Sequence, residues 1–279
     1  MKLIGPALQT LVLISFIHVS SGQESTDSLK KYGYDSLKKY SYLISGIIND
    51  HSANIGTGFF IRSDTNLYLI SAGHVLTGWN AIKGEWDKNY PDSFFIKLKD
   101  RTTGDDILCA INVKAYKKKL VPFSVWSKPD IFIYKVKNPS SYIINSIENL
   151  IVDTVSSYLK EINRVFGYGF ASYTHFSDFD SLLHLTPTLI DASTVMKYGE
   201  MPNIRENNLP DSMHFIIAPV LPWKNNFGRG ASGAPVFIYS EKLGRFIFGG
   251  VIIAANNKGT FDIVIRFEKF WDFFNATKD

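Results

Sequence analysis

The sequence predicts an all-β protein. Short apolar or alternating runs follow one another in two groups, and turn residues such as those at 225–228 and 256–259 separate them. Aromatic residues make up 14% of the chain, which favours β-structure. A regular alternation of strands with long helices, as a parallel α/β fold needs, is absent from the pattern. The chain therefore predicts two small β-barrels or a β-sandwich.

The expected strands follow in chain order. The first group comprises Tyr42–Ile48, Gly58–Arg62, Tyr68–Ser71, Phe94–Leu98, Ile107–Val113 and Ile131–Val136. The second group comprises Arg164–Gly167, Thr186–Val195, Met213–Pro219, Ala234–Ile238, Phe246–Ala254 and Asp262–Arg266. We expect Ser140–Leu159 to connect the two groups as a partly helical segment, and Glu268–Phe274 to close the chain as an amphipathic helix.

The N-terminus has the pattern of a secretory signal. Lys2 supplies a positive start, residues 11–17 form an apolar centre, and small residues precede Gln23. Residues 1–22 are therefore expected to be a signal peptide cleaved near Gly22–Gln23, and the protein to be secreted or periplasmic. The apolar centre is too short to span a bilayer comfortably, and no integral membrane segment is expected after signal removal.

A short duplication follows the signal. Asp27–Tyr32 recurs as Asp35–Tyr40, and the eight-residue offset places both copies at a similar azimuth of a helix. Residues 23–43 are thus expected to form a short helical N-terminal arm, with residues 44–279 as the main domain. Its two halves are expected at about 44–138 and 160–266.

Composition limits the functional classes. The chain is 45% hydrophobic and 20% charged, the balance of a globular protein with a sizeable core. Its net charge of +4 does not by itself imply a nucleic-acid partner, and no nucleic-acid binding is expected. A single cysteine, Cys109, excludes an internal disulfide.

Three stretches carry residues suited to chemistry. His74 follows the strand at 68–71 through the small residues Ala72 and Gly73, which let other backbone approach its imidazole. Asp130 opens an alternating strand, where a carboxylate can be buried and directed at an imidazole. Ser232 lies between Ala231 and Gly233 in a glycine-rich loop, where consecutive backbone amides can point at one spot.

Together these stretches resemble the motifs of the trypsin-like serine peptidases, especially the disulfide-free bacterial branch. Gly230-Ala231-Ser232-Gly233-Ala234-Pro235 resembles the nucleophile loop, Ala72-Gly73-His74-Val75 the histidine motif, and Asp130-Ile131 the aspartate motif. Val165-Phe166-Gly167-Tyr168-Gly169 resembles an early strand and turn of the second barrel. The resemblance covers roughly residues 44 to 274 and implies two six-stranded antiparallel β-barrels.

The resemblance implies a serine endopeptidase. Ser232 would be the nucleophile, His74 the general base, and Asp130 the residue that orients the imidazole. The backbone N–H groups of Gly230 and Ser232 would form the oxyanion hole. Protein or peptide substrates are implied, and no metal or organic cofactor is required. Ala231 stands where zymogens of the family carry an acid, so no ion-pair activation switch is expected.

The substrate pocket is implied in the same way. Its walls would come from Ile252 and Ala254, and its base from near Asn226. Because Asn225–Ala231 contains no acidic residue, an uncharged, apolar residue is expected next to the scissile bond.

Other classes of function fit less well. An α/β-hydrolase would need Gly-x-Ser-x-Gly and a later histidine, and no histidine follows Ser232. A metallopeptidase would need a His-x-x-x-His pair, which is absent. His175, Asp178 and Asp180 are interpreted as a solvated loop. The remaining alternative is a catalytically silent trypsin-like fold that acts as a protein-binding module. The sequence does not determine the oligomeric state.

Overall fold

The computed structural model describes residues 33–49, 52–80, 85–86, 90–114, 129–152, 164–170, 180–197, 214–219, 230–255 and 262–278. The chain divides into two compact units, Met1–Asp35 and Ser36–Asp279. The strands and the site described below all belong to the second unit. The expected signal peptide and the first residues of the expected N-terminal arm lie outside the described residues.

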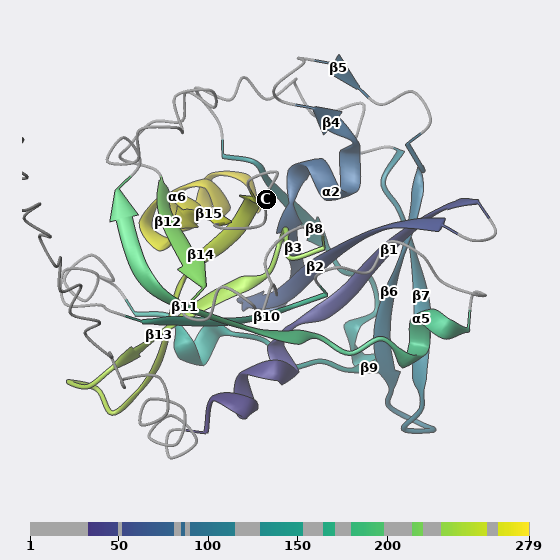
Figure 1. The fold of residues 1–279 in the computed structure, drawn as a ribbon. Helices are drawn as coiled ribbons and strands as arrows, with labels where there is room; N and C mark the ends of the chain where they lie inside the picture. Colours follow the sequence, from purple (N-terminus) through teal and green to yellow (C-terminus); the bar gives the residue numbers. More distant parts are fainter. Residues whose placement is uncertain are drawn as a thin grey trace, which may run out of the picture. The chain divides into compact units, whose positions relative to one another are not determined.

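The first half of the chain forms an antiparallel sheet of seven strands in the order β7-β6-β1-β2-β3-β8, with β9 also paired to β6 (Figure 1). Its strands are β1 (Tyr42–Asn49), β2 (Ser52–Ser63), β3 (Asn66–Ala72), β6 (Ser93–Asp100), β7 (Asp106–Asn112), β8 (Ile131–Lys135) and β9 (Tyr142–Ile143). A separate two-stranded sheet joins β4 (Trp79–Asn80) to β5 (Glu85–Trp86).

The second half forms a closed barrel in the order β10-β11-β12-β15-β14-β13. Its strands are β10 (Val165–Gly169), β11 (Thr188–Lys197), β12 (His214–Pro219), β13 (Pro235–Ser240), β14 (Arg245–Ala255) and β15 (Asp262–Arg266). Every neighbouring pair is antiparallel. Closure leaves no free sheet edge in this half.

The helical elements are short apart from the last one. They are η1 (Tyr34–Tyr40), α2 (Gly73–Thr77), η2 (Pro139–Ser141), η3 (Glu148–Leu150), α5 (Ser181–His184) and α6 (Phe267–Thr277). Among the described residues, no helix has both the length and the apolar character needed to cross a membrane.

Helix α6 packs against both halves of the chain. Phe270 lies 6.1 Å from the ring of Phe59 on β2 and 5.5 Å from that of Phe248 on β14. Phe274 meets Tyr68 on β3 edge to face at 5.4 Å. Such aromatic pairs stabilise beyond the area they bury, so the C-terminal helix fastens the sheet to the barrel.

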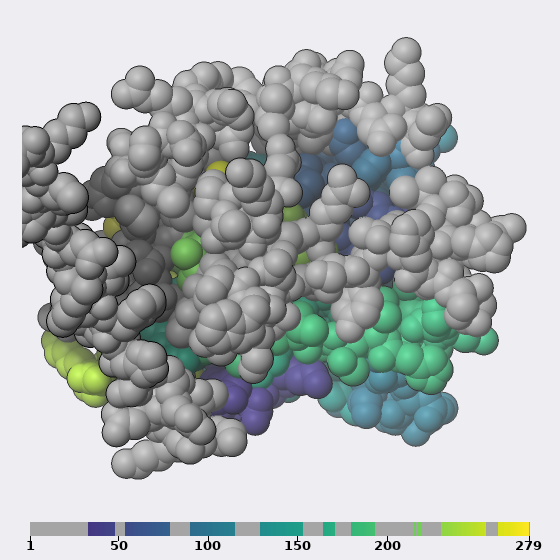
Figure 2. Space-filling model, in the orientation of Figure 1, coloured from purple at the N-terminus to yellow at the C-terminus, as the bar shows by residue number. Residues whose placement is uncertain are grey.

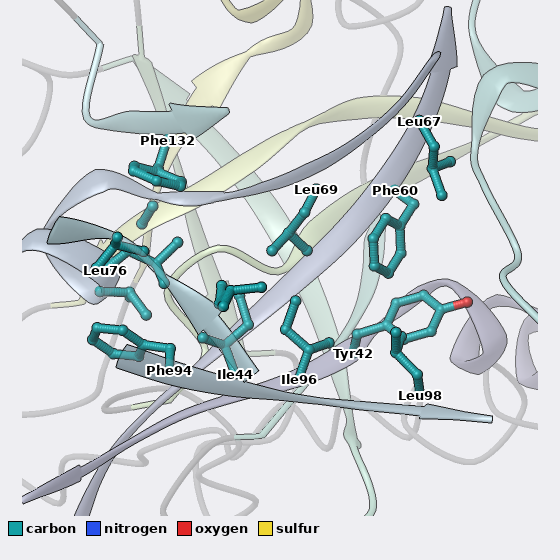
Figure 3. Packing of buried hydrophobic residues seen from close by; sticks show 14 residues of the cluster. Tyr42, Ile44, Phe60, Leu67, Leu69, Leu76, Phe94, Ile96, Leu98 and Phe132 are labelled. Atoms are coloured by element: carbon teal, nitrogen blue, oxygen red, sulfur yellow. The ribbon is translucent and has the colours of Figure 1, made fainter. Parts of the chain in front are cut away.

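The core of the first sheet includes a residue from the turn that carries His74. Leu76 of α2 packs with side chains from five strands, as Figure 3 shows: Tyr42, Ile44, Phe60, Leu67, Leu69, Phe94, Ile96, Leu98 and Phe132. Because Leu76 is fully buried there, any shift of α2 would open a cavity in this core. The hydrophobic core thus fixes the position of the histidine turn.

A second contact links the two halves through a lysine of β6. Lys97 of β6 donates hydrogen bonds to the carbonyl oxygens of Leu183 and, at 3.3 Å, Leu185. Both carbonyls belong to the α5 region, and Figure 2 shows this segment in green beside the blue strands of the first half.

The all-β fold class is confirmed, with two antiparallel sheets and a C-terminal helix, the arrangement of a trypsin-like double barrel. The first half differs from the expected six-stranded barrel in two ways. The two-residue strand β9 makes it seven-stranded, and its described strands follow an open order from β7 to β8. The described part of the expected arm, η1, is a 3₁₀ helix. Residues 42 and 43 already belong to β1 rather than to the arm, because Ser41 donates to the Tyr168 carbonyl at 2.8 Å and Tyr42 packs edge to face on Phe60.

Candidate active site

Three sets of hydrogen bonds hold the backbone of the turn that carries His74. Helix α2 begins where β3 ends, and the Gly73 N–H donates to the Asp130 carbonyl at 3.0 Å. The Tyr90 hydroxyl donates to the carbonyls of His74 at 3.0 Å and Val75 at 2.5 Å. Gly78 closes the turn with φ of +69° and an N–H bond to the His74 carbonyl. Sequence reasoning assigned no role to Tyr90, which is distant along the chain.

His74 and Asp130 form a two-point contact. The His74 backbone N–H donates to Asp130 Oδ1 at 2.9 Å, and the ring Nδ1 donates to Asp130 Oδ2 at 2.5 Å. The side chains remain 36% and 24% exposed, respectively. Since a carboxylate only accepts hydrogen bonds, this contact places the proton on Nδ1 and leaves Nε2 as the available base.

The electrostatics of the pair favour a charged imidazole. Burial lowers the pKa of His74, whereas the Asp130 charge and its hydrogen bond raise it, and the net pKa lies above the ordinary value of 6.5. A carboxylate in hydrogen-bond contact stabilises the imidazolium that forms when the ring accepts a proton.

The loop around Ser232 is a tight turn in which the carbonyls of Gly230, Ala231 and Ser232 each accept a hydrogen bond. Gly230 and Gly233 have φ of +96° and +89°, values that favour glycine. The Ala231 carbonyl accepts the Ala234 N–H at 2.9 Å, and the Gly233 N–H donates to Ile252 on β14 at 2.6 Å. In contrast, no hydrogen-bond acceptor is found for the N–H groups of Gly230 and Ser232 in the described part of the chain.

Thr57 on β2 joins this loop to the first sheet. Its Oγ1 donates to the Gly230 carbonyl at 2.7 Å and accepts the Phe170 N–H at 3.0 Å. Its backbone N–H donates to the Ser232 carbonyl at 2.9 Å. Thr57 is fully buried. The only sequence feature that marks Thr57 is its position between two glycines, and this pattern is equally typical of an ordinary strand.

The serine loop lies beside the histidine turn. A Cβ added to Gly233 would come within 1.9 Å of the Thr57 carbonyl and 3.0 Å of the Ala72 backbone nitrogen. Ala72 is two residues before His74, so the structure brings all three expected catalytic residues to the junction of sheet and barrel. Within the described residues, no hydrogen bond joins Ser232 Oγ to His74.

Replacing Thr57 by valine is expected to lower the free energy of unfolding by about 2–6 kcal/mol. Valine keeps the shape but leaves the buried Gly230 carbonyl and Phe170 N–H without their partner, and each such loss costs about 1–3 kcal/mol. Thr57→Ser keeps the hydroxyl and is expected to cost only about 1 kcal/mol. Urea unfolding measures both values, and equal losses in the two variants would contradict this role of the hydroxyl.

The expected pocket residues are only partly within the described structure. Ile252 is buried on β14, and Ala254 is half-buried two residues further along. Asn226 lies outside the described residues.

The described part of the chain contains no cluster of metal-binding side chains. Among the described residues, no group of three or more His, Cys, Asp or Glu side chains is placed to hold a metal ion. Of the loop at 175–180, only Asp180 is described, as the residue that precedes α5.

Two solved structures to which the chain is similar are serine proteases. The Rv3671c protease in an inactive form has a TM-score of 0.49 at 12% identity, covering 90% of this chain and 96% of its own. A human pathogenic astrovirus serine protease has a TM-score of 0.43 at 13% identity, covering 82% and 90%. No family model and no curated protein matches the chain.

Proposed function

We propose that the protein is a serine endopeptidase with His74, Asp130 and Ser232 as its catalytic residues. The observation that carries the proposal is the two-point contact of Asp130 with His74, beside a loop that presents Ser232. A carboxylate that binds both the backbone and Nδ1 of one histidine fixes the ring tautomer needed for a general base.

The reaction follows from this arrangement. His74 Nε2 takes the Ser232 Oγ proton as the oxygen attacks the scissile carbonyl, and Asp130 stabilises the imidazolium. The imidazolium then gives its proton to the leaving amine, which leaves an acyl ester on Ser232. A water molecule, deprotonated by His74, hydrolyses the ester and restores the hydroxyl. These steps require no metal or organic cofactor.

The backbone of the serine loop supports the oxyanion hole. In a trans peptide the N–H points opposite to the C=O. Because the Ala231 carbonyl is engaged by the Ala234 N–H, the N–H of Ser232 points the other way, out of the turn. With no acceptor for either group among the described residues, the N–H of Ser232 can bind an oxyanion together with the N–H of Gly230. Each such donor contributes about 3–4 kcal/mol of transition-state stabilisation.

The second candidate is a catalytically silent fold that binds proteins. It is favoured by the missing hydrogen bond between Ser232 Oγ and His74 among the described residues. Catalytic hydrogen bonds in substrate-free enzymes are often long and tighten only when substrate binds, so we place hydrolysis first.

Covalent labelling separates the two candidates. The wild-type chain is expected to react with a fluorophosphonate at Ser232 and to degrade an unfolded protein substrate. Ser232→Ala should do neither, whereas Ser93→Ala, which changes an exposed serine at the start of β6, should behave as wild type. Folded wild-type protein that neither labels nor cleaves would overturn the proposal in favour of the binding module.

We further propose that the enzyme is exported. The support is the signal pattern of residues 1–22, and export would bring the site to protein substrates outside the cytoplasm. N-terminal sequencing of the mature protein is expected to begin at or near Gln23, and an intact Met1 in the exported fraction would contradict cleavage there.

A further inference from the structure

Strand β2 supports both parts of the candidate site. Thr57 donates its N–H to the Ser232 carbonyl in the serine loop. Three residues earlier on the same strand, Asn54 Nδ2 donates to the Val75 carbonyl at 3.1 Å and to the Tyr90 hydroxyl. An asparagine amide has two N–H groups, so it can make both bonds at once. The proposed reaction gives no role to Asn54 or Tyr90, although both hold the turn that carries the base.

Two consecutive carbonyl groups of the histidine turn each accept two hydrogen bonds. The His74 carbonyl accepts the Gly78 N–H at 3.0 Å and the Tyr90 hydroxyl at 3.0 Å. The Val75 carbonyl accepts the Asn54 amide and shares the proton of the same hydroxyl, at 2.5 Å. Because a carbonyl oxygen has two lone pairs, both acceptors are fully used. The two peptide planes that follow His74 in the chain are therefore held in place.

The other side of His74 is held by Asp130. Its Oδ1 accepts the His74 backbone N–H at 2.9 Å, which fixes the peptide plane before the histidine. With the flanking planes fixed, only the two side-chain torsions of His74 remain, and the bond from Nδ1 to Asp130 Oδ2 determines those. Asn54 and Tyr90 thus supply the part of the restraint that Asp130 does not.

Tight packing holds Tyr90 and the histidine turn against their surroundings. A Cβ added to Gly78 would lie 2.3 Å from Tyr90 Cγ, so the phenol ring rests directly on the backbone that ends α2. The ring centroid lies 5.8 Å from that of Phe94, which is fully buried. A Cβ added to Gly56 would lie 2.4 Å from Val75 Cγ1, so the turn also packs directly on β2. The Tyr90 hydroxyl is therefore held at the turn by packing as well as by its hydrogen bonds.

We propose that Asn54 and Tyr90 are positioning residues that act through the backbone of His74. They set the place of His74 Nε2 relative to Ser232 Oγ and hold no reacting atom themselves. The inference rests on the proposed peptidase function and adds two residues outside the triad to it. Since a misplacement of about 1 Å can cost about 100-fold in rate, these hydrogen bonds affect turnover beyond their effect on stability.

Tyr90→Phe removes the hydroxyl and keeps the ring. It is expected to lower kcat and kcat/KM by the same factor, about 10- to 100-fold, because the ground-state binding of substrate is unchanged and only the alignment for reaction is lost. KM should stay within about twofold of the wild-type value. The rate of fluorophosphonate labelling at Ser232 should fall by a similar factor, since this reaction also needs the base.

Tyr42→Phe is the matched control. The Tyr42 hydroxyl also bonds two backbone groups, accepting the Asn145 N–H at 2.7 Å and donating to the Asn145 carbonyl at 3.2 Å. Figure 3 shows the Tyr42 ring at the end of the core opposite to Leu76 of α2. This variant should lower the midpoint of urea unfolding about as much as Tyr90→Phe, and keep the wild-type kcat and labelling rate.

Asn54→Asp tests the second residue with almost no change of shape. A carboxylate only accepts hydrogen bonds, so it loses the bond to the Val75 carbonyl and draws the Tyr90 hydroxyl away from His74. The loss of kcat should be at least as large as in Tyr90→Phe. Because the two side chains act as one unit, the double variant should be less than about threefold slower than Asn54→Asp alone.

The outcomes separate this proposal from the proposed function. Wild-type kcat and labelling rate in folded Tyr90→Phe and Asn54→Asp would overturn the positioning role and leave the peptidase intact. An equal loss of kcat in Tyr42→Phe would do the same, because it would assign the effect to general loosening of the sheet. If one of the two variants fails to fold, the other still decides against Tyr42→Phe. Folded wild-type protein that neither labels nor cleaves would instead overturn the proposed function, and this inference with it.

Discussion

Asp130→Asn is expected to lower kcat/KM by about 10⁴-fold while leaving the fold intact. The carboxylate of Asp130 accepts both the backbone N–H of His74, at 2.9 Å, and the ring Nδ1–H, at 2.5 Å. An asparagine presents one oxygen and one NH₂ group, so it cannot accept at both points. With the NH₂ group facing Nδ1, the ring is held in the tautomer whose proton is on Nε2, and the base facing Ser232 is lost.

The same substitution is expected to move the acid limb of the pH–rate profile. His74 must be uncharged to accept a proton, so kcat/KM rises with pH through its pKa, which lies above 6.5 in the wild type. Asparagine removes the negative charge that raises this pKa, and the limb should shift to lower pH. Steady-state kinetics between pH 5 and 9 measures both effects.

Asp106→Asn is the control for the loss of one carboxylate. Asp106 forms an ion pair with Lys97 at 3.1 Å on the partly exposed β6–β7 hairpin. Removing such a pair should change stability by about 1 kcal/mol or less and leave the pH profile unchanged. A wild-type rate and profile in Asp130→Asn would rule out the assigned role of Asp130.

Gly233→Ala is expected to destabilise the protein by about 3 kcal/mol or more, or to prevent folding. The added Cβ would lie 1.9 Å from the Thr57 carbonyl oxygen, which is backbone and cannot turn aside, and 2.4 Å from Ser71 Oγ. The φ of +89° adds about 1–2 kcal/mol for any residue with a Cβ. Since the whole stability of a domain is about 5–15 kcal/mol, a clash of this kind is severe.

Gly244→Ala separates the clash from the backbone conformation. Gly244 also has a positive φ, +61°, but a Cβ there would meet nothing within 4 Å. Its variant should therefore lose only about 1–2 kcal/mol. Thermal or urea unfolding of the two variants gives the comparison, and similar losses in both would show that the loop adapts to the methyl group.

Secondary-structure elements could be predicted from the sequence where the apolar pattern of the element is long. The apolar run at 246–254 forms β14, which extends one residue further at each end. Helix α2 could not be predicted, because five residues form a helix here only through Leu76 in the core and the Tyr90 hydrogen bonds. Strand β9 has two residues and depends on its register with β6, which no local pattern encodes.

The candidate site also contains residues that local sequence indicates and residues that only the structure reveals. Residue type and local small residues indicated His74, Asp130 and Ser232, and their catalytic roles stay predictions until activity is measured. The structural role inferred for Thr57 comes from contacts between segments distant in sequence.

The Thr57 hydroxyl has a consequence for when activity can arise. Its hydrogen-bond partners, Phe170 and Gly230, come 113 and 173 residues later in the chain. A polypeptide emerging from the ribosome therefore makes Thr57 long before the loop that needs it. The proposed hydrolytic activity would then arise only after the second half of the chain has folded against Thr57.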